Sequence, residues 1–419
     1  MVGRLQRDSA GRVLAMKWMD SMKKLEVRQV LRPEIAVPAV YLIFLGFAVI
    51  SFRIDATSRF LLGPEGHFAG PTAAAYIISL LGILILAASA VLGGRLKVNL
   101  DPRLVLVLIF PITFLALYLA LPVSVLTILG ISLGFPILLL VICKRLDTAS
   151  LTIAAFFLAC LFALSILYQG VPIVSASLRD STAVAPARAL FHGFAVFAGA
   201  LLIAYYEKRK AIPGVLFLCA LGVLSGFKSD AVAVLISASI TGLLLGRIST
   251  KEVASAFAIV ALILTAVSTH IAGISYASWK IPPALYIFYR AGLTFSVFNR
   301  IVEMAYPLGY LMGGALLDPS QRIVSTTVLP ELYAKPHIIT STLFGPGMLD
   351  FGLLGIALTA LFIGGYLGFM YRIKEDEFRS CLYAIALTHS FILVEVGLQL
   401  TSILFYLSLL YLALARKER

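Results

Sequence analysis

The chain has 419 residues, of which 60% are hydrophobic and 13% are charged, and its formal net charge is +13. About a quarter of the residues in a soluble domain are charged, so this composition excludes an ordinary soluble globule. Most basic residues lie at the ends of apolar runs, which indicates membrane orientation and not binding to nucleic acid.

Residues 1–34 form a basic N-terminal segment that we predict to be cytoplasmic. Within it, residues 12–31 mix Leu, Met, Trp and Val with Lys and Arg at roughly helical spacing. Such a segment is either an amphipathic helix on the inner membrane surface or a partly ordered tail that fixes orientation. No small-residue cleavage site accompanies the first apolar run, so we expect this run to be retained as a membrane anchor.

Residues 35–419 are predicted to form one all-α, polytopic transmembrane domain. Their apolar runs are about 17 to 25 residues long, the length that an α-helix needs to cross about 30 Å of hydrocarbon. About twelve runs meet this length criterion. They are 35–52, 71–93, 104–120, 122–143, 151–168, 190–206, 212–227, 231–247, 253–273, 346–370, 381–397 and 398–415.

The distribution of Lys and Arg predicts the orientation of these spans. With the N-terminus inside, basic clusters such as 144–145, 208–210 and 416–419 all fall in the cytoplasm, together with the C-terminus. The same threading places residues 53–70, 169–189 and 274–345 outside. The last of these is a large loop between the ninth and tenth spans, and loops of that length are usually functional.

The large external loop contains two distinct segments. Residues 284–305 are predicted to form an amphipathic helix that lies near the membrane surface or dips into it. Residues 306–320 are rich in Gly and Pro and predict an irregular or re-entrant segment packed against protein.

Six basic residues in the two longest external loops run against the positive-inside bias, which suggests a local purpose. They are Arg179, Arg188, Lys280, Arg290, Arg300 and Arg322. The guanidinium fork binds phosphate in a bidentate way, so several external arginines favour a lipid-linked phosphate or diphosphate. Local ion pairs are the alternative, because Arg179 adjoins Asp180 and Arg300 precedes Glu303 at helical spacing.

Other polar residues supply fewer candidates. Lys228, in the short external turn before the eighth span, is a further candidate phosphate contact, and Asp230 is expected to cap that helix. His337 is a candidate general base for an attacking hydroxyl, an ordinary interfacial histidine being the alternative. His389 and Glu395 lie at membrane depth in the eleventh span, and we expect them to bond to each other or to neighbouring helices. The histidines and external carboxylates show no metal-binding spacing, so we expect no metal and no other cofactor.

Three short stretches carry a resemblance to a known family. GVPIV…LRD, between Gly170 and Asp180, is similar to a Gly-x-Pro followed by an arginine; GFKSD, at 226–230, is similar to a Gly-x-Arg turn with Lys228 at the arginine position. TSTLFGPGMLDFGLLG, at 340–355, is similar to a polar entry into a DFGxxG span, whose glycines allow close helix packing. With the span count and the two long loops, this layout resembles the O-antigen and oligosaccharide repeat-unit polymerases, and more distantly the O-antigen ligases. Ser341 stands where the ligases place a histidine, and the RX10G pattern of some polymerases is not cleanly met.

The resemblance implies a fold like the glycosyltransferase-C (GT-C) polymerase and ligase bundles, and a reaction on the outer face of the cytoplasmic membrane. A glycan on one polyprenyl-diphosphate carrier would be transferred to the non-reducing end of another lipid-linked repeat unit. In this scheme the catalytic residues are Arg179, Arg290 and Arg300, which stabilise the leaving diphosphate without metal, and His337 as base. The substrate-binding residues are Arg188, Lys228, Lys280, Arg322 and Asp350. The implied partners, besides the lipid bilayer, are the polyprenyl-diphosphate-linked oligosaccharide, a flippase and a chain-length regulator.

Three alternatives share the membrane architecture. The first is a ligase-like glycan transferase. The second is a transporter or flippase of lipid-linked sugars, which we expect to line a midplane cavity with charges. The third is a glycosyltransferase that uses a lipid-phosphate sugar, with Asp55 or Glu65 of the first external loop as base.

Overall fold

The computed structural model describes residues 29–54, 70–120, 124–175, 178, 184–226, 228–275, 285–318, 322–328 and 340–416. Every regular element in these ranges is a helix, as predicted. The helices are α2 (Pro33–Arg53), α4 (Ala73–Arg95), α5 (Pro102–Ala120), α6 (Val125–Arg145), α7 (Thr148–Tyr168), α9 (Ala185–Tyr205), α10 (Lys208–Leu224), α11 (Lys228–Leu245), α12 (Thr250–Ser275), α13 (Tyr286–Ala305), α14 (Gly314–Leu317), α15 (Arg322–Val328), α16 (Gly345–Ile373), α17 (Glu377–Val396) and α18 (Leu400–Ala415).

Nine of the described helices are long and apolar enough to cross a membrane, which confirms a multi-pass helical membrane protein. They are α2, α4, α5, α6, α7, α9, α11, α16 and α17. The other three predicted spans are also helices, α10, α12 and α18, but they are not among the nine; α10 has 17 residues and α18 has 16. The count of twelve and the orientation therefore stay predictions. We use "predicted outer end" for the helix end that the threading of the sequence places outside.

Local sequence signals determine where many of these helices begin. Four side chains, those of Thr72, Ser124, Asp147 and Asp376, each accept a hydrogen bond from the backbone N–H three residues later, at the starts of α4, α6, α7 and α17. Such caps satisfy N–H groups that have no partner within the helix. Prolines occupy the first turns of α2, α9 and α16, where a missing N–H costs nothing.

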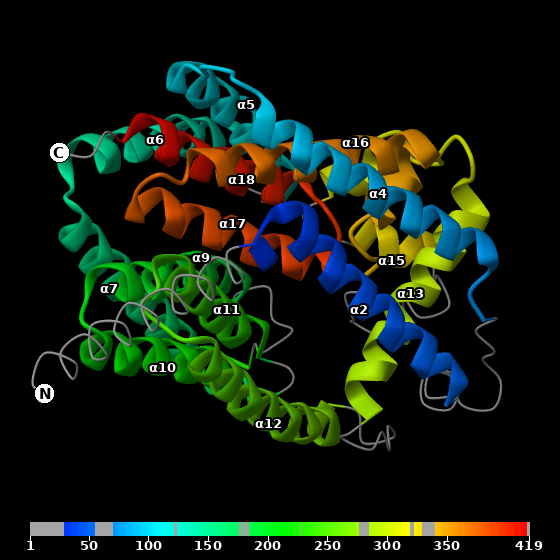
Figure 1. Ribbon diagram of the computed structural model, residues 1–419, viewed down its shortest axis with the longest axis horizontal. Helices are drawn as coiled ribbons and strands as arrows, with labels where there is room; N and C mark the ends of the chain where they lie inside the picture. Colours follow the sequence, from blue (N-terminus) through cyan, green and yellow to red (C-terminus); the bar gives the residue numbers. More distant parts are fainter. Residues whose placement is uncertain are drawn as a thin grey trace, which may run out of the picture.

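Helices α4 and α16 lie side by side along much of their length because small residues form their interface (Figure 1). A Cβ atom built on Gly364 would lie 2.3 Å from the carbonyl oxygen of Leu86, and one on Gly368 would lie 2.0 Å from that of Ala90. No side chain fits at either position, so these glycines allow the two backbones to meet.

The glycines of the predicted DFGxxG entry have a similar role. Gly352 has a φ of +60° and interrupts α16 with a kink, and a Cβ atom there would lie 2.0 Å from the carbonyl oxygen of Pro307. One turn later, a Cβ on Gly355 would lie 1.8 Å from the carbonyl oxygen of Gly347. Close packing of α16 against itself and against residues 306–313 thus requires glycine at both positions.

Helix α17 is the central element of the bundle (Figure 1). It packs against α9, α11, α2, α16 and α18, and most of its side chains are buried. Its C-terminal residues, which are at the predicted outer end, therefore lie among residues from helices that are far apart in the sequence.

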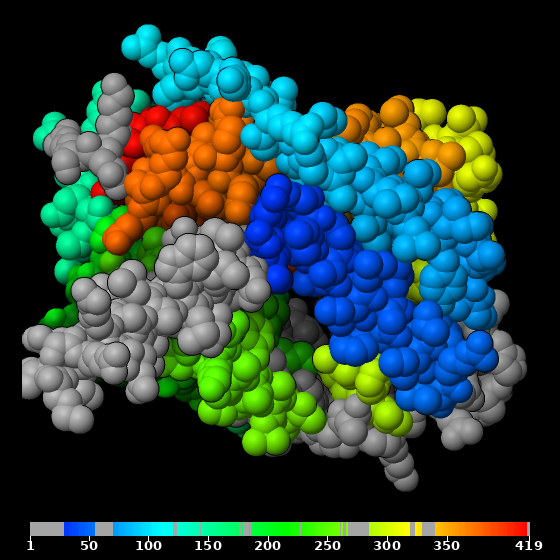
Figure 2. Space-filling view, viewed as in Figure 1, coloured from blue at the N-terminus to red at the C-terminus, as the bar shows by residue number. Residues whose placement is uncertain are grey.

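Helix α13 matches the predicted amphipathic helix in position but is more deeply packed than a helix lying on a membrane surface. Residues 291–299 are all buried, and the helix packs against α2, α16 and α4. It is therefore buried within the bundle, and its placement relative to the membrane surface stays a prediction. On the face shown in Figure 2, a hollow lies between α2 and α12.

Candidate functional site

Arg290 is the centre of a polar cluster that three separate segments form. It lies in the second turn of α13, where its Nε donates to Oε1 of Glu395 on α17 at 2.5 Å. Its Nη2 donates to the hydroxyl of Thr340 at 3.1 Å, and that hydroxyl also bonds to the hydroxyl of Thr294 at 2.9 Å. The guanidinium is thereby held in one orientation at the predicted outer end of α17.

Backbone hydrogen bonds fix the segment that carries Thr340. The N–H groups of Thr342 and Leu343 donate to the carbonyl oxygens of Glu395 and Val394, both at 3.2 Å. Thr340, Ser341 and Thr342 are buried, and Thr342 has a φ of +68°. The polar entry into α16 is thus joined to the end of α17 by main-chain contacts.

Electrostatics keep Arg290 charged. Burial lowers the pKa of a guanidinium, but the carboxylate of Glu395 and the nearby Tyr286 and Tyr289 together raise it by more, so the pKa of Arg290 lies above its ordinary value. The side chain is nevertheless 32% exposed, so the charge remains accessible.

A second polar cluster lies at the predicted outer ends of α9 and α11. Nδ1 of His192 is 2.9 Å from Oδ1 of Asp230, whose side chain is 3% exposed. Nε of Arg188 is 3.8 Å from Oδ2 of the same carboxylate. Asp230 was predicted to cap α11. It lies in the first turn of that helix, and among the described residues its side chain contacts His192, Arg188 and Ser229.

One contact connects the clusters. Nζ of Lys228, at the start of α11, is 4.1 Å from the ring centroid of Tyr286, which is four residues before Arg290 on α13 and therefore on the same face. This contact joins the start of α11, which carries Asp230, to the start of α13, which carries Arg290.

The second arginine of α13 is elsewhere. Arg300 lies ten residues after Arg290, which places it about 15 Å further along the helix. Next to it, Oδ1 of Asn299 accepts bonds from the backbone and hydroxyl of Thr72, at 2.7 and 2.8 Å, and Nδ2 of Asn299 donates to Glu303 at 2.7 Å. Arg300 therefore lies near the start of α4, and the structure does not bring it together with Arg290.

Asp350, predicted to bind substrate, has a structural task. It is 1% exposed, and its two oxygens accept hydrogen bonds from the backbone N–H groups of Ala315 and Leu316, at 2.8 and 2.7 Å. These bonds attach α14 to α16. Residues 306–318 are mostly irregular, as predicted for this Gly- and Pro-rich segment. Ala315 and Asp318 are buried, but Leu308 and Met312 are 86% and 88% exposed, so only part of the segment packs against protein.

Several predicted residues fall outside the described part of the chain. These are Arg179, Lys280, His337 and the alternative bases Asp55 and Glu65; Arg322 begins α15, but the position of its side chain is also outside the description. Their proposed roles stay predictions.

Sequence reasoning missed the partners that complete the site. Glu395 was recognised as a polar residue at membrane depth, but its partner is Arg290, while the ring of His389 packs against Phe405 and Tyr406. His192 was one of several scattered histidines, and no local pattern distinguished it because its partner Asp230 is 38 residues away.

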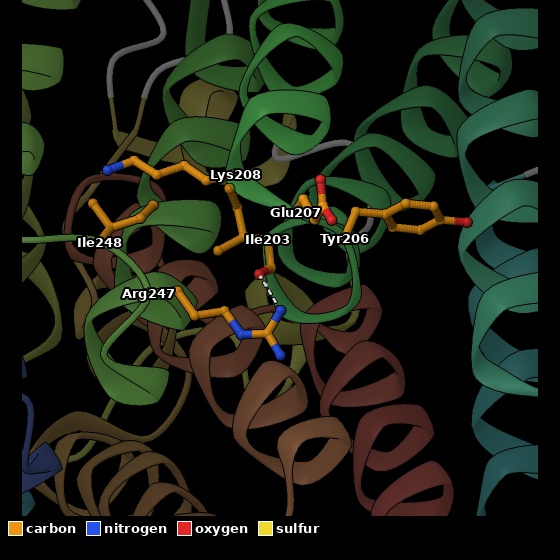
Figure 3. A pocket seen from close by; sticks show the side chains of 6 residues that line it. All are labelled: Ile203, Tyr206, Glu207, Lys208, Arg247 and Ile248. Carbon is orange, nitrogen blue, oxygen red and sulfur yellow. Dashed lines mark hydrogen bonds between the residues drawn. The ribbon is translucent and has the colours of Figure 1, made fainter.

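A pocket of about 280 Å³ lies at the opposite ends of α9 and α11, which are predicted to be cytoplasmic (Figure 3). It is lined by Ile203, Tyr206, Glu207, Lys208, Arg247 and Ile248. Arg247 donates to the carbonyl oxygen of Ile203 at 3.4 Å and to Glu377 at 2.9 Å. This pocket is separate from the two clusters.

Comparison with known protein families identifies the chain. Residues 31–407 match the model of a family described as "Putative O-antigen polymerase", which covers most of the chain and all the described helices except the end of α18. No curated protein and no solved structure matches the chain significantly. The chain therefore belongs to the O-antigen polymerase family.

Proposed function

We propose that this protein is a membrane glycosyltransferase that polymerises lipid-diphosphate-linked oligosaccharide repeat units on the outer face of the cytoplasmic membrane. Membership of the O-antigen polymerase family supports repeat-unit polymerisation as the activity. The observation that carries the assignment to this site is the orientation of Arg290 by Glu395 and Thr340.

The geometry of Arg290 suits a diphosphate. A guanidinium has five N–H donors, and the described contacts of Arg290 use one on Nε and one on Nη2. The remaining donors lie in the plane that Glu395 and Thr340 fix, which is the arrangement that a bidentate phosphate contact needs. Because the fork is already oriented, little side-chain entropy is lost when the substrate binds.

The wider region supplies further positive charge. Arg290, Arg188 and Lys228 are three cations, and Asp230 and Glu395 are two carboxylates, so the two clusters have a balance of three minus two, or one positive charge. A diphosphate entering from the outer leaflet would be attracted to such a region because opposing charges interact strongly away from bulk water.

The proposed reaction is a displacement at the anomeric carbon of the donor glycan. A hydroxyl oxygen of the acceptor sugar forms a bond to that carbon, and the bond from the carbon to the diphosphate oxygen breaks. The electron pair leaves with the diphosphate, whose growing charge Arg290 stabilises, with Arg179 as a further predicted contact. Charge stabilisation by cationic side chains makes the proposed reaction independent of metal.

The test is deletion of the gene in its host, followed by complementation and gel analysis of surface glycans. We expect single repeat units in the deletion strain and long chains after complementation with the wild-type gene, but not with Arg290→Gln at equal membrane abundance. Unchanged chain length in the deletion strain would refute polymerisation. Long chains that remain on their lipid carrier would instead indicate a ligase, and loss of all external repeat units would indicate a flippase.

A further inference from the structure

The proposed displacement needs a group that accepts the proton of the acceptor hydroxyl, and the His192–Asp230 pair has the geometry for this task. The inference rests on the proposed function. Asp230 is 2% exposed, and its Oδ1 is 2.9 Å from Nδ1 of His192. A buried carboxylate next to an imidazole orients the ring and stabilises its protonated form, as in other acid–base pairs.

The hydrogen bond determines which nitrogen is basic. A carboxylate oxygen only accepts, so Nδ1 of His192 carries the proton that it donates to Asp230. Nε2 then holds the lone pair. Nε2 makes no hydrogen bond within the described residues and is not a buried atom, and the side chain is 26% exposed. It can therefore meet a substrate hydroxyl.

Other carboxylates of the region are already engaged. Glu395 accepts from Arg290, and both oxygens of Asp350 accept from backbone N–H groups. His389 packs between Phe405 and Tyr406. Among the described residues around Arg290, His192 is thus the side chain with an oriented and accessible basic atom.

The position of His192 also fits. Lys228, two residues before Asp230, lies over the ring of Tyr286, one turn from Arg290. A sugar held between the two clusters would have its diphosphate at Arg290 and its anomeric carbon toward His192.

We infer that His192 is the general base of the transfer and that Asp230 is its positioning residue. Nε2 of His192 takes the proton of the acceptor hydroxyl as the oxygen bonds to the anomeric carbon and the diphosphate leaves with the electron pair of the broken bond. The proton then returns to solvent or to the departed diphosphate, so His192 is regenerated in each cycle.

The charged and titratable groups around His192 come from three helices. Arg188 lies one turn earlier on α9, Asp230 and Lys228 come from α11, and His389 comes from α17. The other helices on α9 are α7, which carries no charged side chain, and α10, whose charges 208–210 lie at its opposite end.

The decisive variant is His192→Asn. Its amide nitrogen replaces Nδ1 and still donates to Asp230, so only the basic Nε2 is lost. With purified protein and lipid-linked repeat units, we expect kcat to fall by about 10²–10⁴-fold, with KM for the donor unchanged. Asp230→Asn should lower kcat less and leave KM for the donor unchanged, because an amide no longer holds the imidazole with Nδ1 as the donor and Nε2 as the basic atom. Lys208→Gln, in the distant pocket, is the matched control and should retain activity.

The outcomes separate the inference from the proposed function. If the wild-type protein polymerises and His192→Asn retains its kcat, or loses only donor affinity, His192 is not the base. If the wild-type protein makes no polymer, the proposed function fails. Should His192→Asn not yield monodisperse protein, His192→Gln is measured by the same criteria, since its amide is isosteric with the Nε2 edge and cannot take the proton.

Discussion

The ion pair between Arg290 and Glu395 allows structural and catalytic roles of Arg290 to be separated. The perturbation is a double-mutant cycle with Arg290→Gln, Glu395→Gln and the combined variant. If Arg290 serves only to pair with Glu395, each single variant and the double variant lose the same interaction and have similar activity. If Arg290 also binds the leaving diphosphate, Arg290→Gln loses far more activity than Glu395→Gln.

The structure supports an estimate of both effects. The two side chains are 32% and 41% exposed, so we expect the pair to contribute only about 1–2 kcal/mol to stability. In Glu395→Gln the amide oxygen still accepts from Nε at the same place, so we expect activity to fall by about tenfold through loss of the charge-assisted bond. Arg290→Gln removes the cation that is proposed to face the leaving diphosphate, so it should lower kcat by about 10²–10³-fold. Arg290→Lys should recover little, because an ammonium lacks the planar fork that can bond to Glu395 and contact a phosphate in a bidentate way.

The assay is the conversion of purified lipid-linked repeat units to polymer, followed by gel electrophoresis, with protein stability measured by thermal unfolding. A matched control exists in the same chain. Arg247 and Glu377 form a pair at the predicted cytoplasmic side with side chains 35% and 44% exposed, and Arg247→Gln should have a similar effect on stability without the loss of activity. Equal activity losses in Arg290→Gln and Glu395→Gln, or in Arg290→Gln and Arg247→Gln, would refute a phosphate contact by Arg290.

Three further predictions concern the scaffold. Gly368→Ala places a methyl group 2.0 Å from a backbone oxygen of α4, so it should lower the free energy of unfolding by about 3 kcal/mol or more and lower the melting temperature markedly. Gly365→Ala, whose methyl group would meet nothing within 4 Å, should leave the melting temperature unchanged. Equal melting temperatures of the two variants would contradict the packing argument. Asp350→Asn should weaken hydrogen-exchange protection of the Ala315 and Leu316 amides by about 1–2 kcal/mol, and unchanged protection would show that the carboxylate does not hold α14. Hydrogen bonds from Lys208 and Ser249 lower the pKa of Glu252 from 4.5 to about 2. The contribution of the Glu252 carboxylate to the stability of the first turn of α12 is therefore fully present above pH 4.5 and is lost as the pH falls through about 2. Exchange of the Ser249 amide in the wild type and in Glu252→Gln measures this, and a pH response that survives in the variant must come from another group.

The sequence predicted the helices well because the membrane restricts the choice. A spanning segment must satisfy all its backbone groups internally, so an apolar run of sufficient length has to be a helix. The predicted runs 71–93, 151–168 and 381–397 correspond to α4 (Ala73–Arg95), α7 (Thr148–Tyr168) and α17 (Glu377–Val396). Boundaries differ by a few residues where a cap such as Asp147 or Asp376 begins the helix before the apolar run.

The candidate site was predictable only in part. The external arginines could be recognised because they violate the charge rule for loops, and Arg290 is found at the centre of a cluster. Arg300 shares its helix but not its site, since ten residues along a helix separate the two side chains. Asp350, predicted to bind substrate, instead has both oxygens bonded to backbone N–H groups of α14, which a sequence motif cannot reveal.

The sequence alone determined that this chain is a helical membrane protein with unusual cations in its predicted external loops, because apolar length and charge bias act locally along the chain. Only the tertiary structure decided which polar residues meet. Arg290 and Glu395 are 105 residues apart, and His192 and Asp230 are 38 apart. Their contact depends on which helices are neighbours and how each helix is rotated about its axis. In a bundle, close packing sets both, as where Gly364 and Gly368 of α16 pack against α4. The apolar runs have similar compositions, so composition alone does not specify which helices pack against each other.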